Sequence, residues 1–413
     1  MIKRYRRTAV SQYFLTGLVL IALVAIGYLS MVTMRLIDFT DQFVVPWAAG
    51  RAWLLNGINP YDPSVITLAE NTLTNSTYLG AMPQLTILIE PAINFIFYLP
   101  FSLMPYEISR AFWVTSIIVI IGLIGYFSLQ LSGWKITIIE KISIILMTII
   151  WFPGVNAVLK GQISPFIILL TIIGIYLILQ EKDTKAGFVL ALTFGSLPTT
   201  GLVLFLLIIW SLSRKRWSIL KAYFSGVAFL IIITLLLLPT WVLDWLKTVF
   251  GGYGSWDWIQ TPLMDLSTVL PGVSNYLSIF LHGMIAIILF VLWITLLGKK
   301  GRVFTWKVLV MLVIAYLFHV TASFRQLFLV FPAMFMVFRF WSERWGVYGR
   351  VFSWLILILL VVSSWWFVTP VISFTMDLSN PLLTIGLPIF VFISMMWVRW
   401  WALEIPNLPF EGR

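Results

Sequence analysis

Long apolar runs recur along almost the whole 413-residue chain, and they constrain its fold more than any other feature. YFLTGLVLIALVAIGYLSMVTM (13–34) and AYFSGVAFLIIITLLLLPTWVL (222–243) are two of them. A helix of about 18 or more apolar residues is long enough to cross a bilayer. Charged residues make up 10% of the chain, against about 25% in soluble proteins. The sequence therefore predicts an all-α polytopic membrane protein, with the first run retained as a helix because it lacks a signal-peptide cleavage site.

The basic residues predict the topology. They cluster in short segments between the runs, and such segments stay in the cytoplasm. We therefore expect both termini to be cytoplasmic, together with SRKRW (213–217), GKKGR (298–302) and RFWSERWGVYGR (339–350). The net charge of +11 therefore reflects basic residues that set the topology, and it does not indicate nucleic-acid binding. The predicted external segments are 36–83, 244–275, 322–325 and 369–382.

The middle of the chain needs two segments that do not cross, because otherwise the basic segments on either side of it would lie on opposite sides of the membrane. Lys135, Lys141 and the segment 179–185 look cytoplasmic, so only one of the runs 85–104 and 108–131 crosses fully. We assign the crossing to 108–131. The run 85–104 contains Glu90, Pro91 and Pro100, and is predicted to be a re-entrant or interfacial helix.

The run 187–212 is interrupted by GSLPTT, and we predict two shorter helices that enter the membrane and return. Irregular backbone at that depth needs surrounding protein or a water-filled cavity. The total is roughly ten full crossings in one continuous domain spanning 1–413.

Several classes of chemistry are excluded by composition. The chain has no cysteine, which excludes disulfides and thiolate metal sites. It has only two histidines, too few for a histidine-rich metal site. It lacks a Gly-rich phosphate loop, an HExxH motif, a nucleophile elbow and a nearby Asp-x-Asp. We therefore expect no required metal and no cofactor.

The segment after the first run, IDFTDQFVVPWAAGRAWLLNGINPYDP (37–63), carries an unusual density of polar residues. It resembles the first external loop of glycosyltransferase family 87, membrane enzymes of the GT-C type. The shared pattern is an acid, an aromatic residue, a small-residue stretch, an Arg, a Gly and Pro-Tyr-Asp. The stretches 91–113 and 159–192 are also similar to the family. The chain departs from the pattern at Ile89–Glu90–Pro91 and at Leu197–Pro198, where the family often has Tyr-Pro-Pro and Lys-Pro.

The resemblance implies a GT-C-like bundle of roughly 10–12 transmembrane helices. It also implies that the large first external loop, 36–107, carries short interfacial helices and forms the catalytic rim. The implied reaction moves a sugar, mannose or a similar hexose or pentose, from a polyprenyl-phosphate donor to a hydroxyl acceptor. The acceptor would be a lipid-linked or cell-envelope glycan at the external face of the cell membrane. The implied partners are this donor, the acceptor and membrane lipids, and no nucleic acid.

Such a transfer needs a carboxylate that takes the proton of the attacking hydroxyl. Asp41 and Asp38 are the candidates, and Asp41 is preferred because its spacing to Ala48–Ala49 fits the family better. The competing interpretation is that one of the two caps the helix that begins near Phe43. Glu90 is either a second acid of the sugar pocket or an acid at the water interface.

The departing phosphate needs a cation. Arg325 either clamps this phosphate or extends to the interface, and His319 either shares its site or is simply hydrogen-bonded. Lys160 and Gln162 would reach the external face, where Gln162 could hold a sugar hydroxyl. Arg51 either pairs with an acid of its loop or has a structural role. Asn-Pro-Tyr-Asp-Pro (59–63) is strong turn chemistry.

Two other functions remain open. A polytopic transporter or lipid flippase for an envelope precursor also needs many spans and broken helices. It would not transfer labelled sugar in detergent. A membrane scaffold would tolerate replacement of both Asp41 and Asp38.

Overall fold

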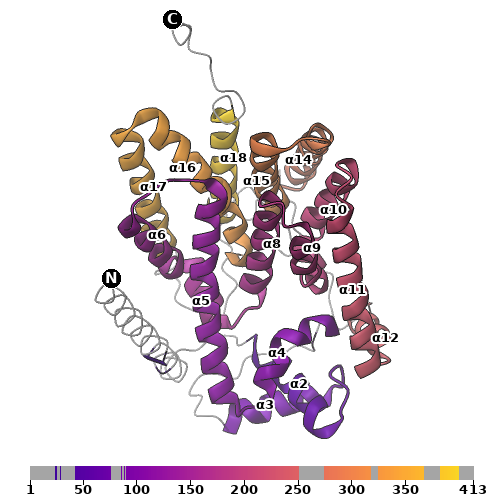
Figure 1. Ribbon diagram of the computed structural model, residues 1–413. Helices are drawn as coiled ribbons and strands as arrows, with labels where there is room; N and C mark the ends of the chain where they lie inside the picture. Colours follow the sequence, from indigo (N-terminus) through magenta and orange to yellow (C-terminus); the bar gives the residue numbers. More distant parts are fainter. Residues whose placement is uncertain are drawn as a thin grey trace, which may run out of the picture.

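The computed structural model describes residues 24–25, 28, 42–75, 85, 88, 90–250, 274–317, 324–366 and 382–399. Every regular element in these ranges is helical, and the predicted all-α polytopic membrane fold is confirmed. The helices stand side by side as a bundle, and a group of short helices covers its lower end (Figure 1).

Five helices in the described ranges are long and apolar enough to cross a membrane. They are α5 (Tyr106–Ser132), η2 with α10 (Phe194–Ser196 and Leu197–Ser213), α11 (Trp217–Leu237), α14 (Ser274–Leu296) and α17 (Val347–Trp366). A sixth crossing results if α6 and α7 (Ile138–Ile150 and Phe152–Lys160), which meet at 54°, form one span.

Shorter helices complete the bundle: α8 (Ser164–Leu179), α15 (Gly301–Leu317), α16 (Phe331–Trp345) and α18 (Leu387–Trp397). The first apolar run lies almost entirely outside the described residues.

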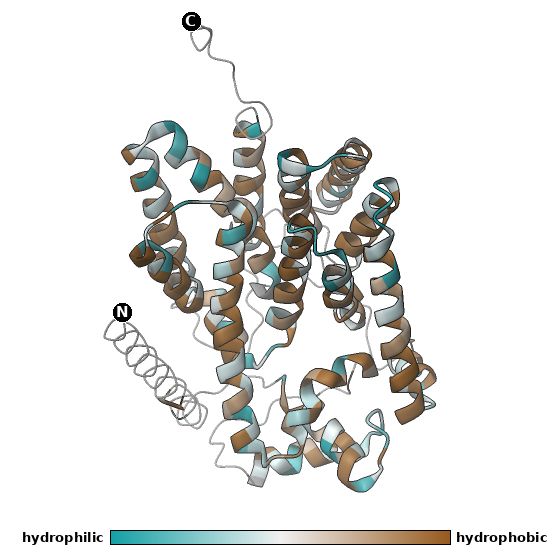
Figure 2. Cartoon of the chain, in the orientation of Figure 1, coloured by the Kyte–Doolittle hydropathy of each residue, from teal (hydrophilic) through white to brown (hydrophobic). Residues whose placement is uncertain are grey.

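The predicted cytoplasmic segments share one end of the bundle. Arg216 forms an ion pair with Asp183, which joins the α8–α9 turn to the α10–α11 turn. Arg214 Nη1 donates to the Gly298 carbonyl at 3.1 Å, which adds the α14–α15 turn. Hydrophilic residues gather at this upper end (Figure 2). These turns therefore lie together, as the basic residues predicted. That this end faces the cytoplasm stays a prediction.

The turns around α5, α6, α16 and α17 lie at the same end (Figure 1). Arg339 Nη1 donates to the Ser132 carbonyl at 3.2 Å. Arg350 Nε lies 3.7 Å from Glu140 Oε1. The segments 132–141 and 339–350 are thus adjacent, again as the basic residues predicted.

The run 85–104 does not cross the bundle. It ends in η1 (Ala92–Asn94) and α4 (Phe95–Ser102), and eight residues of α-helix span only about 12 Å. Among the described residues before 133, α5 is the one helix long enough to cross, and its bounds lie close to the predicted 108–131.

A break forms at GSLPTT as predicted, but only the helix before it is short, because η2 with α10 is long enough to cross a membrane. The helix α9 (Asp183–Ala191) has nine residues, about 14 Å of rise, which is less than half the hydrocarbon thickness of about 30 Å. The chain then turns through η2 into α10, and the Arg216–Asp183 ion pair holds the two outer ends together. The segment enters the bundle and returns.

Small residues allow close packing at two places. In α2 (Val44–Asn56) a Cβ on Gly50 would meet the Ser102 side chain, so α2 lies directly against α4. In α9 a Cβ on Gly187 would meet the Ile219 carbonyl oxygen and, at 2.7 Å, Ala222 Cβ of α11. The small-residue stretch of the first loop is therefore a helix contact. The helix α3 (Ser64–Asn75) follows α2 and also packs on it.

We predict that Gly187→Ala destabilises the protein by about 1–3 kcal/mol, because the added methyl group overpacks the α9–α11 contact. The matched control is Gly283→Ala in α14, where a Cβ would meet nothing within 4 Å. Both substitutions improve helix propensity by about 1 kcal/mol, so the melting temperature in detergent should fall for the first variant only. Equal melting temperatures would contradict the close contact.

Candidate functional site

The predicted site residues differ in how far the structure describes them. Asp41, Asp38 and His319 lie outside the described residues. The backbone of Arg325 lies in η5 (Phe324–Val330), and its side chain is not described. Glu90, Arg51, Gln162 and Lys160 are described.

The first loop contacts the bundle at the end of α7. The described chain resumes at Gln42, one residue after Asp41, and its backbone N–H donates to the Lys160 carbonyl at 2.9 Å. Lys160 is the last residue of α7, and Gly161 follows in the left-handed conformation, with φ of 64°. The segment directly after the predicted base is thus bonded to another predicted site residue.

The neighbouring carbonyls of this helix end are also bonded. Arg110 Nη2 of α5 donates to the Leu159 carbonyl at 2.5 Å, and Trp113 Nε1 donates to the Gly161 carbonyl at 2.8 Å. The last carbonyls of a helix lack partners in their own helix, and here three in a row receive donors from outside. We call this set the α7 joint: the carbonyls of 159–161 with Gln42, Arg110 and Trp113.

Arg110 was not among the predicted site residues. Its side chain is fully buried, and a Cβ on Gly161 would meet Arg110 Nη1 at 2.9 Å. A sequence signal existed, because Arg110 is a charged residue at the start of an apolar crossing, where such residues usually have a specific partner.

Two predicted binding residues are buried beside this joint. Lys160 is 3% exposed and Gln162 is 2% exposed. Neither Nε2 nor Oε1 of Gln162 forms a hydrogen bond within the part of the chain that the structure describes. A buried polar atom without a partner costs about 1–3 kcal/mol, so this amide is suited to bind a hydroxyl group that enters the site.

An aromatic cluster joins the α7 joint to Glu90. Phe43 lies with its ring centroid 5.1 Å from that of Trp113 and 6.1 Å from that of Tyr98. The Tyr98 hydroxyl in turn donates to Glu90 Oε1 at 3.2 Å. The structure therefore brings Glu90, Lys160 and Gln162 around one cluster, next to the first residues after Asp41.

Glu90 is half-buried and lies before η1, outside the spanning helices. Burial raises the pKa of its carboxyl group from 4.5 to about 7, although hydrogen bonds from Tyr98 and Asn94 act in the opposite direction. Asn94 Nδ2 lies 3.4 Å from Oε2 and also donates to Ser196 Oγ of η2 at 3.2 Å. The carboxyl group is thus connected to the tip of the α9–α10 turn and titrates near neutral pH.

The Asn-Pro-Tyr-Asp segment forms the predicted turn. Asp62 Oδ1 accepts from the Ser64 N–H at 2.8 Å at the start of α3. Asn59 Nδ2 donates to Asp244 Oδ2 at 2.7 Å, and Asp244 belongs to α12 (Trp241–Phe250). The Tyr61 hydroxyl donates to the Glu90 carbonyl at 2.9 Å. The turn therefore positions Glu90 and α12.

Arg51 contacts a different region. Its Nη1 donates to the carbonyls of Ser102 at 3.3 Å and Met104 at 3.4 Å, and its guanidinium lies 5.4 Å from the Trp47 ring centroid. These contacts join α2 to the α4–α5 turn, in agreement with the structural alternative.

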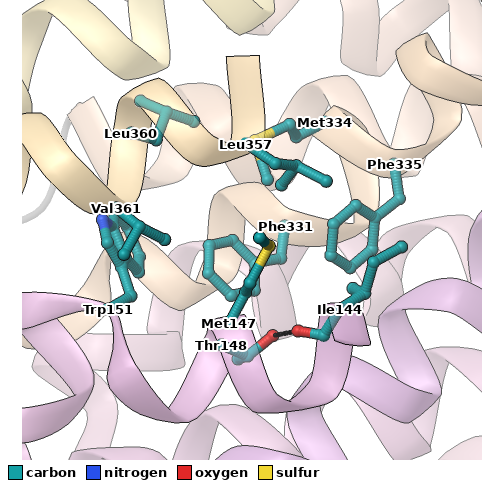
Figure 3. Close-up of a pocket in the computed structure, with 10 residues that line it drawn as sticks. All are labelled: Ile144, Met147, Thr148, Trp151, Phe331, Met334, Phe335, Leu357, Leu360 and Val361. Atoms are coloured by element: carbon teal, nitrogen blue, oxygen red, sulfur yellow. Dashed lines mark hydrogen bonds between the residues drawn. The ribbon is translucent and has the colours of Figure 1, made fainter. Parts of the chain in front are cut away.

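An apolar groove lies between α6, α16 and α17 (Figure 3). Its empty volume is about 300 Å³, part of which is open to the surroundings. The lining residues are Ile144, Met147, Thr148, Trp151, Phe331, Met334, Phe335, Leu357, Leu360 and Val361. The hydroxyl group of Thr148 is already bonded to the Ile144 carbonyl of its own helix, so the groove suits a hydrocarbon chain. Trp151 lies at the bend between α6 and α7.

Comparison with protein families gives one match: the model of glycosyltransferase family 87 matches residues 90–321 of this chain, which is more than half of it. The match includes Glu90, Arg110, Lys160 and Gln162. Comparisons with curated proteins and with solved structures give no match.

We predict that Glu90 makes stability depend on pH. With a folded pKa of about 7 and an unfolded value of 4.5, the folded state binds the proton more tightly between these values. The contribution of Glu90 to stability is therefore fully present below pH 4.5 and is lost as the pH rises to 7, by about 3 kcal/mol for one proton. Glu90→Gln should remove most of the fall in melting temperature between pH 5 and 8.

The control is Glu70→Gln, an exposed acid of the same loop, which should keep the wild-type slope. An unchanged slope in Glu90→Gln would show that Glu90 does not titrate in this range.

Proposed function

The chain belongs to glycosyltransferase family 87, and on this premise we propose that it moves a sugar, mannose or a similar hexose or pentose, from a polyprenyl-phosphate donor to a hydroxyl acceptor. The acceptor is a lipid-linked or cell-envelope glycan at the extracytoplasmic face. The glycosyltransferase activity follows from the family, and the observation that carries the site is the bond from Gln42 to Lys160.

Asp41 is the proposed general base, and Asp38 is the alternative. Asp41 directly precedes Gln42 in the sequence, and the bond from Gln42 to Lys160 supports this choice. The carboxylate takes the proton of the acceptor hydroxyl as the hydroxyl oxygen attacks the sugar. The C1–phosphate bond breaks, and the bonding electrons leave with the polyprenyl phosphate.

The leaving phosphate gains negative charge, which buried cations stabilise. Lys160 at the α7 joint is one proposed partner, and Arg325, with His319, is the second. A guanidinium group can bind two phosphate oxygens at once. Gln162 is proposed to bind a sugar hydroxyl, which would satisfy its buried amide atoms. Glu90 is proposed as the second acid of the sugar pocket.

The apolar groove is the proposed site of the prenyl chain. Trp151 is one of its lining residues, and the nine residues of α7 that follow lead directly to Lys160. Nine helical residues rise about 14 Å, so α7 runs from the proposed tail site to the proposed phosphate site. A lipid in this position would have its apolar part between α6, α16 and α17 and its head group at the α7 joint.

Replacement of the base should abolish transfer. We expect Asp41→Asn to lower the transfer rate from synthetic polyprenyl-phosphate mannose by about 10²–10⁴-fold, measured as labelled product on a panel of acceptors in detergent. Asp62→Asn is the control, because Asp62 lies in the same loop and caps α3, and its rate should stay within a few-fold of wild type.

If Asp38→Asn loses activity and Asp41→Asn does not, the roles of the two acids are reversed. Full activity in both would contradict a base in this loop. Lipid transport by the reconstituted protein, together with no labelled product in detergent, would favour a flippase.

Blocking the groove should depend on the length of the donor. We expect Met147→Trp to raise the KM for long-chain prenyl donors several-fold, because the indole fills the groove, and to leave donors with one or two isoprene units unaffected. Leu355→Trp is the control, since Leu355 of α17 is exposed and does not line the groove. Equal effects on short and long donors would place the chain elsewhere.

A further inference from the structure

The basic end of the bundle carries two kinds of cations. Three arginines there form ion pairs: Arg216 with Asp183, Arg339 with Glu343 and Arg350 with Glu140. The cations where α14, α15 and α18 meet do not. Lys299, Lys300, Arg302, Lys307 and Arg399 form no ion pair with any residue that the structure describes. We call these five residues the basic corner.

Lys307 is the inner member of the basic corner. It belongs to α15 and is 8% exposed. Its Nζ donates to the Thr295 carbonyl at 2.5 Å, in the last turn of α14, where a cation also favours the helix dipole. Lys299 and Arg399 are close enough to repel its charge. Lys307, Lys299 and Arg399 thus bring three positive charges close together, and an anion bound between them would offset their mutual repulsion.

The surroundings of the basic corner indicate a lipid as the source of this anion. The Arg399 guanidinium lies 6.0 Å from the Trp306 ring centroid, and Trp306 Nε1 donates to the Met395 carbonyl at 3.2 Å. Trp345 and Trp397 lie nearby with ring centroids 5.4 Å apart. Tryptophan is enriched at the level of lipid head groups.

Apolar side chains are exposed on the helices that lead away from the corner. Ile294 of α14 is 46% exposed and Ile393 of α18 is 61% exposed. A phosphate held at the corner by a lipid would therefore have apolar helix surface beside it for its chains. A soluble anion would contact only the cations and would leave this apolar surface uncovered.

We propose that the basic corner binds the phosphate of an anionic phospholipid, with the acyl chains along the exposed faces of α14 and α18. Lys299 and Arg399 contact the head group, and Lys307 contributes its charge from within the fold. Basic pockets between transmembrane helices bind anionic head groups in this way. The site lies at the opposite end of the bundle from the α7 joint and does not depend on the proposed sugar transfer.

The test measures lipid retention by native mass spectrometry on the full chain in detergent, with phosphatidylglycerol and phosphatidylcholine of identical acyl chains. Wild type should retain phosphatidylglycerol preferentially. The double variant Lys299→Gln/Arg399→Gln should lower this affinity about 10- to 30-fold, since two charges near a head group are removed. Lys307 is left intact because it caps α14.

The matched control is Arg339→Gln/Arg350→Gln, which removes the same charge from the same end at paired positions. Its affinity should stay within about two-fold of wild type. Equal retention of both lipids, or equal loss in both double variants, would overturn the proposal.

Two further arms address other anions. Displacement of phosphatidylglycerol by millimolar inorganic phosphate would assign the corner to a soluble anion. Deletion of residues 401–413, which contain Glu404 and Glu411, should leave retention unchanged. A large rise on deletion would assign the corner to the chain's own tail and would also overturn the proposal.

Discussion

Three consecutive backbone carbonyls at the end of α7 join this helix to the first loop and to α5. Their donors come from Gln42 in the first loop and from Arg110 and Trp113 in α5. Each such bond contributes about 1 kcal/mol net, and a buried carbonyl without a donor costs more than that. The positions of Gln42 and Phe43 before α2 and of Gln162 after α7 therefore depend on this joint.

The bilayer explains why the site is built from broken elements. A continuous crossing satisfies its own backbone and leaves no polar group to bind a sugar phosphate. The chain instead ends α7 inside the protein, and turns α9 back through η2 into α10. Such irregular backbone is tolerated because protein surrounds it. Glu90 reaches the tip of that turn through Asn94 and Ser196, so both broken elements contribute to one site.

The sequence predicted those features that are encoded locally. Run length predicted roughly ten crossings, and the described residues contain five helices long enough to cross, or six with the bent α6–α7 pair. Glu90 with Pro91 and Pro100 indicated that 85–104 stops short, and GSLPTT marked the turn between α9 and α10. The basic turns were predicted to share a face, and their hydrogen bonds agree.

Contacts between distant segments were not predictable in the same way. Arg110 and Leu159 are 49 residues apart, and Asn59 and Asp244 are 185 residues apart. No periodicity records such pairs. The apolar groove between α6, α16 and α17 was also missed, because its lining residues are ordinary apolar residues of three helices. The placement of Arg51 against the α4–α5 turn agrees with one of the alternatives left open.

The most direct test of the account is the transfer rate of Gly161→Ala compared with Gly57→Ala. Both glycines have positive φ, 64° and 67°, so both substitutions carry the same backbone strain. Only the Cβ at 161 would meet Arg110 Nη1 and Phe43 Cβ, at 2.9 and 3.0 Å, whereas the Cβ at 57 would meet nothing within 4 Å. The account predicts at least a ten-fold lower kcat for Gly161→Ala than for Gly57→Ala when each is measured well below its own melting temperature. Equal kcat values in the two variants would contradict the claim that the α7 joint positions the catalytic loop.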